Sequence, residues 1–323
     1  MGPNRIDVHH HFVPDFYRRA LEVSGCDPSG WFIPEWTPDL DQKVNDKFGI
    51  TTTILSLTAP GACILKDPQA SANLARQANE FCAKLRDERP NQYGFFAALP
   101  NLLDEELTLN EITYAYDVLK ADGVVLFTRY GKGNHYLGHP DFKGIWAELN
   151  RRSAVILVHP THPVDTAQVS GLPQPVIRYP FETTQTAIDM LHNKTVRNNP
   201  KYKIILSHAG GTLPYLIGRP TSVINKTKED AEAFWEDARN FYYDTAVAGT
   251  ENVLCILEKF AKPGHILYGS DTPYANNGII DFHTSRQDAY RFQDPALAPQ
   301  VNRENALALF PRLKSQSIEL NGT

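Results

Sequence analysis

Five polar side chains stand where short apolar runs of this sequence end. His9 and His11 lie in the first run, His159 and His208 close two later runs, and Asp271 follows the last one. Imidazole and carboxylate groups are the ligands that zinc, manganese and iron take from proteins. Because residues i and i+2 of a strand point to the same side, His9 and His11 should face one point together. We predict a metal site built from His9, His11, His159 and Asp271.

His208 is the remaining imidazole of this set. Because imidazole is the side chain that exchanges protons most readily near neutral pH, we expect His208 to act as a general acid or base beside the metal, with Asp271 as the second catalytic group. A single histidine in a strand is more often structural, and an H-x-H pair also occurs by chance. The joint occurrence at several strand ends favours the metal site. His10 should face the opposite way and pack against a helix.

Three other histidines, His135, His139 and His162, fall in segments after the fourth and fifth runs and could meet a substrate.

The elements that would position these groups are eight short, apolar runs rich in β-branched and aromatic residues. Such runs are typical of strands buried on both faces. The expected strands are 5–9, 52–57, 94–99, 123–128, 154–159, 203–208, 240–245 and 265–270.

Helical patterns alternate with these strands, most clearly at 69–89, 140–152 and 182–193. Alternation of strands and helices predicts a parallel sheet, and eight strands predict an α/β fold of the (β/α)8 TIM-barrel type. In such a barrel the carboxyl ends of the strands meet at one mouth, where catalytic groups gather. An open doubly wound sheet is the alternative, but its glycine-rich phosphate fingerprint is missing. We expect a single domain over residues 1–323.

The segment of about 12–46 departs from this alternation because it is rich in Pro, Trp and Asp. An insertion after the first strand would lie over the barrel mouth, and we predict that it forms an aromatic lid, unless it is a plain surface loop. Segment 160–180 could contribute in the same way. Aromatic residues expected to wall a substrate pocket are Phe12, Trp31, Trp36, Phe181 and Tyr274.

Composition excludes several classes of function. The chain has 323 residues and a net charge of −5, so it offers no basic surface for a nucleic acid or an anionic membrane. Its apolar runs are far shorter than the ~20 residues of a bilayer span. The four cysteines are scattered without a C-x-x-C pair, which indicates a reducing compartment, and no signal-peptide pattern opens the chain. We predict a cytoplasmic protein.

With these residues in place, the chain resembles the amidohydrolase superfamily over about 5–312. The resemblance is to the branch that contains aminocarboxymuconate-semialdehyde decarboxylase and the hydroxybenzoate decarboxylases, and most of all to the fungal 6-methylsalicylate decarboxylases. The segments that carry it are IDVHHHF, Tyr136-Leu137-Gly138 followed by DFKGIWAEL, VHPTHP, YPFETTQTAIDML, ILSHAGGTLPYL and LYGSDTPY.

The resemblance implies that His9, His11, His159 and Asp271 hold the metal and that His208 is the catalytic imidazole. Hydrolases of the superfamily bridge two metals with a lysine at the end of the fourth strand. Here that strand ends FTRY, with no lysine before Lys132, so we expect one divalent metal. The nitrogen-rich donor set favours Zn²⁺, with Mn²⁺ as the alternative.

The function implied is metal-dependent, non-oxidative decarboxylation of an ortho-hydroxybenzoate, with 6-methylsalicylate giving m-cresol and CO2 as the first candidate. Relatives that act on dicarboxylates can use an arginine in the connection between the first two strands; near that point this chain has Lys43 instead, which fits a monocarboxylate substrate. One alternative is a lactonase-like hydrolase of the same superfamily, and another is a catalytically silent barrel that acts as a scaffold. Relatives are often dimers or larger, so we also expect a homo-oligomer.

Overall fold

The computed structural model describes residues 4–133, 135–162 and 171–314. Its main sheet has eight strands in the order β1-β2-β3-β4-β7-β8-β9-β10, and each pairs in parallel with the next. The strands are β1 (Arg5–Phe12), β2 (Ile50–Leu57), β3 (Tyr93–Ala97), β4 (Gly123–Phe127), β7 (Val155–His159), β8 (Lys203–Leu206), β9 (Tyr242–Asp244) and β10 (Ile266–Leu267).

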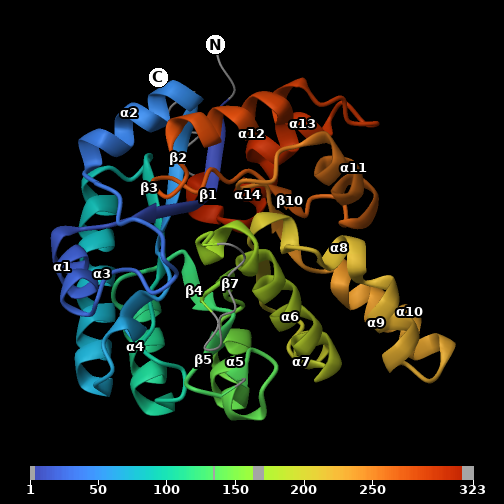
Figure 1. The fold of residues 1–323 in the computed structure, drawn as a ribbon, viewed down its shortest axis with the longest axis horizontal. Coiled ribbons are helices and arrows are strands. Elements are labelled where there is room, and N and C mark those ends of the chain that lie inside the picture. Colours follow the sequence, from blue (N-terminus) through green and yellow to red (C-terminus); the bar gives the residue numbers. More distant parts are fainter. Residues whose placement is uncertain (1–3, 134, 163–170, 315–323) are drawn as a thin grey trace.

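Backbone hydrogen bonds join the two ends of this sheet. The Val8 amide donates to the Tyr268 carbonyl (3.1 Å), and the Asp271 amide donates to the His9 carbonyl (2.9 Å). The His11 amide donates to Thr272 (2.6 Å), where a parallel bridge pairs Thr272 with His10. In Figure 1 the first strand, in blue, lies beside the red end of the chain. The expected barrel of eight parallel strands is confirmed.

Helices surround the barrel (Figure 1). The expected helices correspond to α3 (Pro68–Glu88), to α5 (Lys143–Arg151) with the 3-10 turn η2 (Pro140–Phe142) before it, and to α6 (Arg178–His192). Helix α6 begins four residues earlier than predicted because Pro180 fits within a first helical turn. The α-helices are α1 (Asp15–Val23), α2 (Pro38–Phe48), α3 (Pro68–Glu88), α4 (Glu105–Asp117), α5 (Lys143–Arg151), α6 (Arg178–His192), α7 (Thr195–Asn198), α8 (Leu213–Leu216), α9 (Gly218–Ile224), α10 (Lys228–Arg239), α11 (Glu251–Phe260), α12 (Asn277–Ala289), α13 (Leu297–Pro299) and α14 (Asn305–Leu309).

Short elements fill the connections. A two-stranded antiparallel hairpin, β5 (Arg129–Tyr130) with β6 (His135–Tyr136), follows β4. Single-turn elements are η1 (Gly61–Ile64), η2 (Pro140–Phe142), η3 (Gln174–Val176) and η4 (His208–Gly210), and the π-helical η5 (Gln300–Glu304) precedes α14.

The inserted segment between β1 and β2 is shorter than the expected insertion of about 12–46. Phe12 is the last residue of β1, and Pro38–Phe48 form α2, the helix that leads into β2. The Thr37 hydroxyl accepts from the Leu40 amide with Pro38 at the first helical position, and Gly49 ends α2 with a φ of 65°. The additional segment is therefore 13–37, and its role as a lid stays a prediction.

Two further expectations concern the chain as a whole. All four cysteines are free in the structure. Among the described residues, every helix is too short or too polar to cross a bilayer. Part of the predicted 160–180 loop, residues 163–170, lies outside the described residues.

Candidate active site

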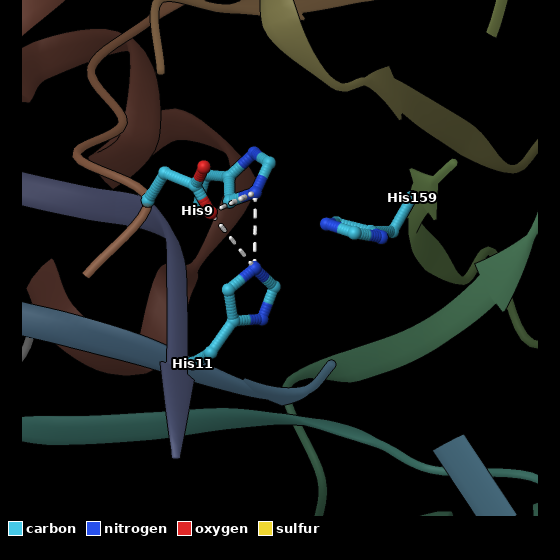
Figure 2. Close-up of side chains that lie close together, drawn as sticks. His9, His11 and His159 are labelled. Atoms are coloured by element: carbon cyan, nitrogen blue, oxygen red, sulfur yellow. Dashed lines mark hydrogen bonds and ion pairs between the residues drawn. The ribbon is translucent and has the colours of Figure 1, made fainter. Parts of the chain in front are cut away.

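Four donor atoms converge at the carboxyl ends of the strands, as predicted. His9 and His11 project from β1 with their Nε2 atoms 3.1 Å apart. Asp271 Oδ1 lies 3.4 Å from His9 Nε2 and 3.3 Å from His11 Nε2. His159, at the end of β7, points toward this pair from across the barrel (Figure 2). Each of the four residues offers one ligand atom, and these four atoms lie within 4.8 Å of one another.

Each imidazole is oriented by a hydrogen bond on its other nitrogen. His9 Nδ1 contacts Asp244 Oδ2 (2.8 Å), His11 Nδ1 contacts the Ser56 carbonyl (3.2 Å) and hydroxyl (3.0 Å), and His159 Nδ1 donates to the Pro160 carbonyl (2.7 Å). A proton on Nδ1 leaves the Nε2 lone pair free, which is the arrangement that metal-binding histidines adopt.

The electrostatics of the cluster favour a cation. Burial raises the pKa of Asp271, but the imidazoles of His11 and His9 that face it hold it well below the usual carboxyl range. Burial lowers the pKa of His11 and, with the other imidazoles, that of His159. Burial alone would also lower the pKa of His9, yet the carboxylates of Asp244 and Asp271 raise it to about 10. The cluster therefore combines an ionised carboxylate, the neutral imidazoles of His11 and His159, and an attraction for positive charge at His9.

This donor set fits a single divalent transition ion. Bonds of about 2.0–2.1 Å from a tetrahedral zinc ion place neighbouring ligand atoms about 3.3 Å apart. The separations of 3.1, 3.3 and 3.4 Å among His9, His11 and Asp271 agree with that geometry. At the end of β4, where a lysine would bridge a second metal, the chain has Phe127, Thr128 and Arg129, so the expectation of one metal is supported by the donor set present.

His208 lies beside the four donors, in the turn after β8. Its ring centroid is 4.7 Å from that of His9 and 6.1 Å from that of His159. The Nδ1 atom contacts the Ala246 carbonyl (2.9 Å), and the His208 amide donates to Asp244 Oδ1 (2.9 Å). His208 and Asp271 both have left-handed backbones, with φ of 54° and 65°. Strain of this kind is typical of functional positions held by their surroundings.

His10 faces away from the cluster, as expected, and contacts helix α2. Its Nδ1 lies 2.9 Å from Asp7 Oδ2 and its Nε2 lies 2.5 Å from Asp41 Oδ1. Burial would lower the pKa of His10, but the two carboxylates, that of Asp41 above all, raise it to about 10. A charged imidazole thus links β1 to α2 on the outer face of the barrel.

A cavity of about 370 Å³ opens above the cluster. Trp31 and Tyr274, two of the predicted wall residues, line it, together with His159, His208 and Asp271. The Tyr274 ring meets His11 edge-on with centroids 5.6 Å apart. The remaining lining residues are Asp27, Ser29, Thr58, Ala59, Pro175, Val176, Tyr179, Pro180, Val247, Ala275 and Ile279.

The other three predicted wall residues lie elsewhere. Phe12 and Trp36 are buried against each other and against Phe81 of α3, because the end of β1 turns this side of the strand toward the helices. Phe181 is 47% exposed because it lies on the outer side of the first turn of α6, whose neighbouring residues Tyr179 and Pro180 face the cavity. Aromatic character alone does not reveal which face of an element a residue occupies.

Sequence reasoning missed three residues of this site. Asp244 ends β9 and is fully buried, and its position at a strand end was the available signal. Tyr179 opens the YPFETT segment and meets His159 edge-on at 6.1 Å. Asp27 comes from segment 13–37, where no periodic pattern marks it; its Oδ1 accepts from the Ser29 amide (2.8 Å), and burial raises its pKa.

Comparisons with known proteins agree with this geometry. The amidohydrolase family model matches residues 6–312. The chain is 51% identical to the 6-methylsalicylic acid decarboxylase acuB of Aspergillus aculeatus over 98% of both chains. It is 50% identical to the 6-methylsalicylic acid decarboxylase of Penicillium expansum, covering 96% of this chain and 97% of that one.

Solved structures share the fold. An amidohydrolase II superimposes with a TM-score of 0.85 at 29% identity, covering 95% of this chain and 99% of that one. A dihydroxybenzoic acid decarboxylase from Polaromonas, solved with bound manganese and 2-nitroresorcinol, gives a TM-score of 0.75 at 23% identity, covering 96% and 97%. The resemblance stated from the sequence motifs is confirmed: the chain belongs to the amidohydrolase family, in the branch that holds these decarboxylases.

Proposed function

We propose that this chain is a carboxy-lyase that decarboxylates an ortho-hydroxybenzoate, with 6-methylsalicylate, giving m-cresol and CO2, as its first substrate. The observation that carries the proposal is the convergence of three imidazoles and a carboxylate beneath a cavity walled by aromatic rings. Relatives about half identical to this chain bear the name 6-methylsalicylic acid decarboxylase, which supports the substrate.

We propose Zn²⁺ as the ion held by His9, His11, His159 and Asp271, because three nitrogen donors and one oxygen suit it. The manganese of the Polaromonas decarboxylase keeps Mn²⁺ as the alternative. A bound divalent ion would supply Lewis acidity that orients the carboxylate and ortho-hydroxyl and stabilises phenolate charge.

The protein side chains supply orientation and the proton. The Trp31, Tyr179 and Tyr274 rings wall a flat slot for the benzene ring. Decarboxylation needs a proton on the ring carbon that bears the carboxylate. The C–C bond to the carboxylate then breaks, CO2 leaves, and the electron pair of that bond restores the aromatic ring. Asp271 is held ionised by two imidazoles and is a poor acid. We therefore assign proton delivery to the protonated ring of His208, whose Nδ1 donates to the Ala246 carbonyl and whose Nε2 would carry the proton that is delivered.

The cavity also bears on substrate charge. Asp27 is the acidic group away from the metal donors among the lining residues, and it is 9% exposed. A second carboxylate on the substrate would be repelled there, which agrees with a monocarboxylate. We expect hydroxyisophthalates to react more slowly than 6-methylsalicylate, and Asp27→Asn to reduce this difference.

The decisive experiment is a panel of substituted salicylates incubated with the metal-loaded protein, with CO2 and phenol quantified. In D2O, m-cresol should carry one deuterium at the position that the carboxylate left. His9→Ala and Asp271→Asn should abolish turnover, and His208→Asn should lower kcat by about 10²–10⁴-fold, as is typical for the loss of a general acid. His192→Asn, on the exposed end of α6, serves as the matched control.

Turnover retained in His9→Ala or Asp271→Asn would contradict the metal assignment. Opening of lactones or esters without CO2 release would instead identify the hydrolase alternative, which the decarboxylase relatives do not favour. Full activity in His208→Asn would return proton delivery to Asp271 or to a water.

Location and assembly are two further parts of the proposal. We propose that the protein acts in the cytoplasm, supported by its four free cysteines, and as a homo-oligomer, supported by the resemblance alone. Sedimentation of the purified protein tests the assembly, since a monomer at micromolar concentration would contradict it.

A further inference from the structure

A second cluster of metal-ligating side chains lies outside the cavity. His135 of β6, His139 just before η2, and Asp141 within η2 each offer one ligand atom, and these atoms lie within 4.8 Å of one another. The two histidines are among those expected from the sequence to meet substrate. Neither lines the cavity above the active site, so the proposed decarboxylation leaves this cluster without a role.

The distances in this cluster are those of a metal site and not of hydrogen bonds. Asp141 Oδ2 lies 3.5 Å from His135 Nε2 and 3.4 Å from His139 Nδ1. Hydrogen-bonded histidine–carboxylate pairs of this protein are much closer, at 2.8 Å for His9 with Asp244 and 2.9 Å for His10 with Asp7.

The contacts between the proposed metal donors of the active site have similar lengths. There, the contacts of Asp271 Oδ1 with His9 and His11 measure 3.4 and 3.3 Å. Ligand atoms on a tetrahedral zinc ion are about 3.3 Å apart, whereas N–H···O hydrogen bonds span about 2.7–3.2 Å. The surface cluster therefore matches the metal donors of the active site and not the hydrogen-bonded pairs.

The proton arrangement also leaves room for a cation. The Asp141 amide donates to His139 Nδ1 over a long 3.3 Å contact, so this nitrogen carries no proton, and an ion that binds there would take its lone pair in place of the amide. His135 Nδ1 is buried without a hydrogen-bond partner in the part of the chain that is described. Two electron-rich atoms that face each other at 3.4 Å are stabilised when a positive ion lies between them.

We propose that His135 Nε2, His139 Nδ1 and the Asp141 carboxylate form a second site, specific for a divalent transition ion of the zinc type. Two nitrogens and one oxygen are the donors that Zn²⁺ and Co²⁺ accept. The three side chains are 27%, 35% and 55% exposed, so an ion can enter from solvent and complete its coordination with water.

Occupancy of this site would fix the hairpin after β4 to η2. The hairpin already packs on α6, where the Tyr136 hydroxyl lies 3.2 Å from Glu182 Oε1 and 2.9 Å from Gln185 Oε1. Tyr179, one turn before Glu182 on α6, walls the cavity. The site is thus structural in character and separate from the catalytic metal.

The test is a count of bound ions on the full-length protein. Wild type, dialysed against excess Zn²⁺ and then freed of loose ion, should hold two ions per chain by elemental analysis. His139→Gln and Asp141→Asn should each hold one and keep wild-type decarboxylase activity. His192→Gln is the control and should hold two. Titration with Co²⁺, followed by its visible absorption, should show two phases in wild type and one in either variant.

Equal ion counts in wild type and both variants would overturn the proposal. His9→Ala provides the converse arm, because it should lose the catalytic ion and keep the ion at His139. If His139→Gln fails to fold by circular dichroism, Asp141→Asn, which alters a more exposed side chain, decides the outcome.

Discussion

Asp244 organises two histidines of the active site at once. One carboxylate oxygen faces His9 Nδ1 at 2.8 Å, and the other accepts from the backbone amides of His208 (2.9 Å) and Ala246 (3.0 Å). This arrangement fixes the proton of His9 on Nδ1 and directs its Nε2 lone pair toward the metal donors. A residue outside the proposed donor set therefore sets the protonation state of a proposed metal donor.

Asp244→Asn should weaken metal binding at the active site by about 10–100-fold, the usual cost of losing such a supporting carboxylate. An asparagine whose oxygen keeps the two backbone amides would turn its NH2 group toward His9 and move the ring proton to Nε2. The measurement is a competition titration of the loaded protein with a chelator. Asp281→Asn, an exposed acid of α12, is the control. Unchanged affinity in Asp244→Asn would contradict this account.

At the scale of elements, helix α2 is held to the barrel by one buried carboxylate. Asp41 accepts from His10 Nε2 (2.5 Å), Trp36 Nε1 (3.2 Å), Asn45 Nδ2 (3.0 Å) and the Tyr93 hydroxyl (2.8 Å). These donors belong to β1, β3, α2 and the chain just before α2, so one side chain connects β1, which carries His9 and His11, with its neighbours.

Asp41→Ala should destabilise the fold by about 3–5 kcal/mol, because it leaves a buried charged imidazole and three further donors without an acceptor. Urea denaturation followed by circular dichroism measures the change in the free energy of unfolding. Asp39→Ala, on the exposed face of the same helix, should cost at most about 1 kcal/mol. Similar losses in the two variants would show that the network contributes little.

Elements also show where sequence patterns stop being informative. The runs at 203–208 and 265–270 predicted longer strands than β8 and β10, because each pattern continues past Leu206 and Leu267, the last residues of the two strands. At Gly269 a Cβ atom would come within 2.8 Å of His9 Cβ, so the backbone must approach β1 closely there. Hydrophobic pattern gives the type of element, whereas close approach between distant segments sets its end.

For the whole molecule, the eight strands, their order and the four converging donors could be predicted, since apolar runs and strand-end histidines are local features. The residues that wall the pocket could not be predicted in this way. Trp31 and Tyr274 line the cavity while Phe12 and Trp36 pack in the core, and that choice depends on how helices cover the barrel. Asp27 and Tyr179 reach the cavity only through the folded connections that carry them.

Metal should stabilise the entire barrel, because its donors come from β1, β7 and the chain after β10. Binding to the folded state alone adds about 2.7 kcal/mol when free metal is a hundred times Kd. We expect Tm to rise by several degrees on addition of Zn²⁺ to chelator-treated protein. The His139→Gln background removes the surface site from this measurement, and His11→Ala in that background should show no rise. An equal rise in His11→Ala would place the stabilising ion elsewhere.

The backbone pairing between β1 and the chain after β10, which closes the barrel, has a consequence for biosynthesis. His9 and His11 leave the ribosome among the first residues, whereas Asp271, which donates its amide to the His9 carbonyl, follows some 260 residues later. A nascent chain therefore carries two of its donors long before it can assemble the set. An interrupted translation product that lacks the last strand has an open sheet and lacks Asp271, so premature termination would leave the proposed metal site incomplete.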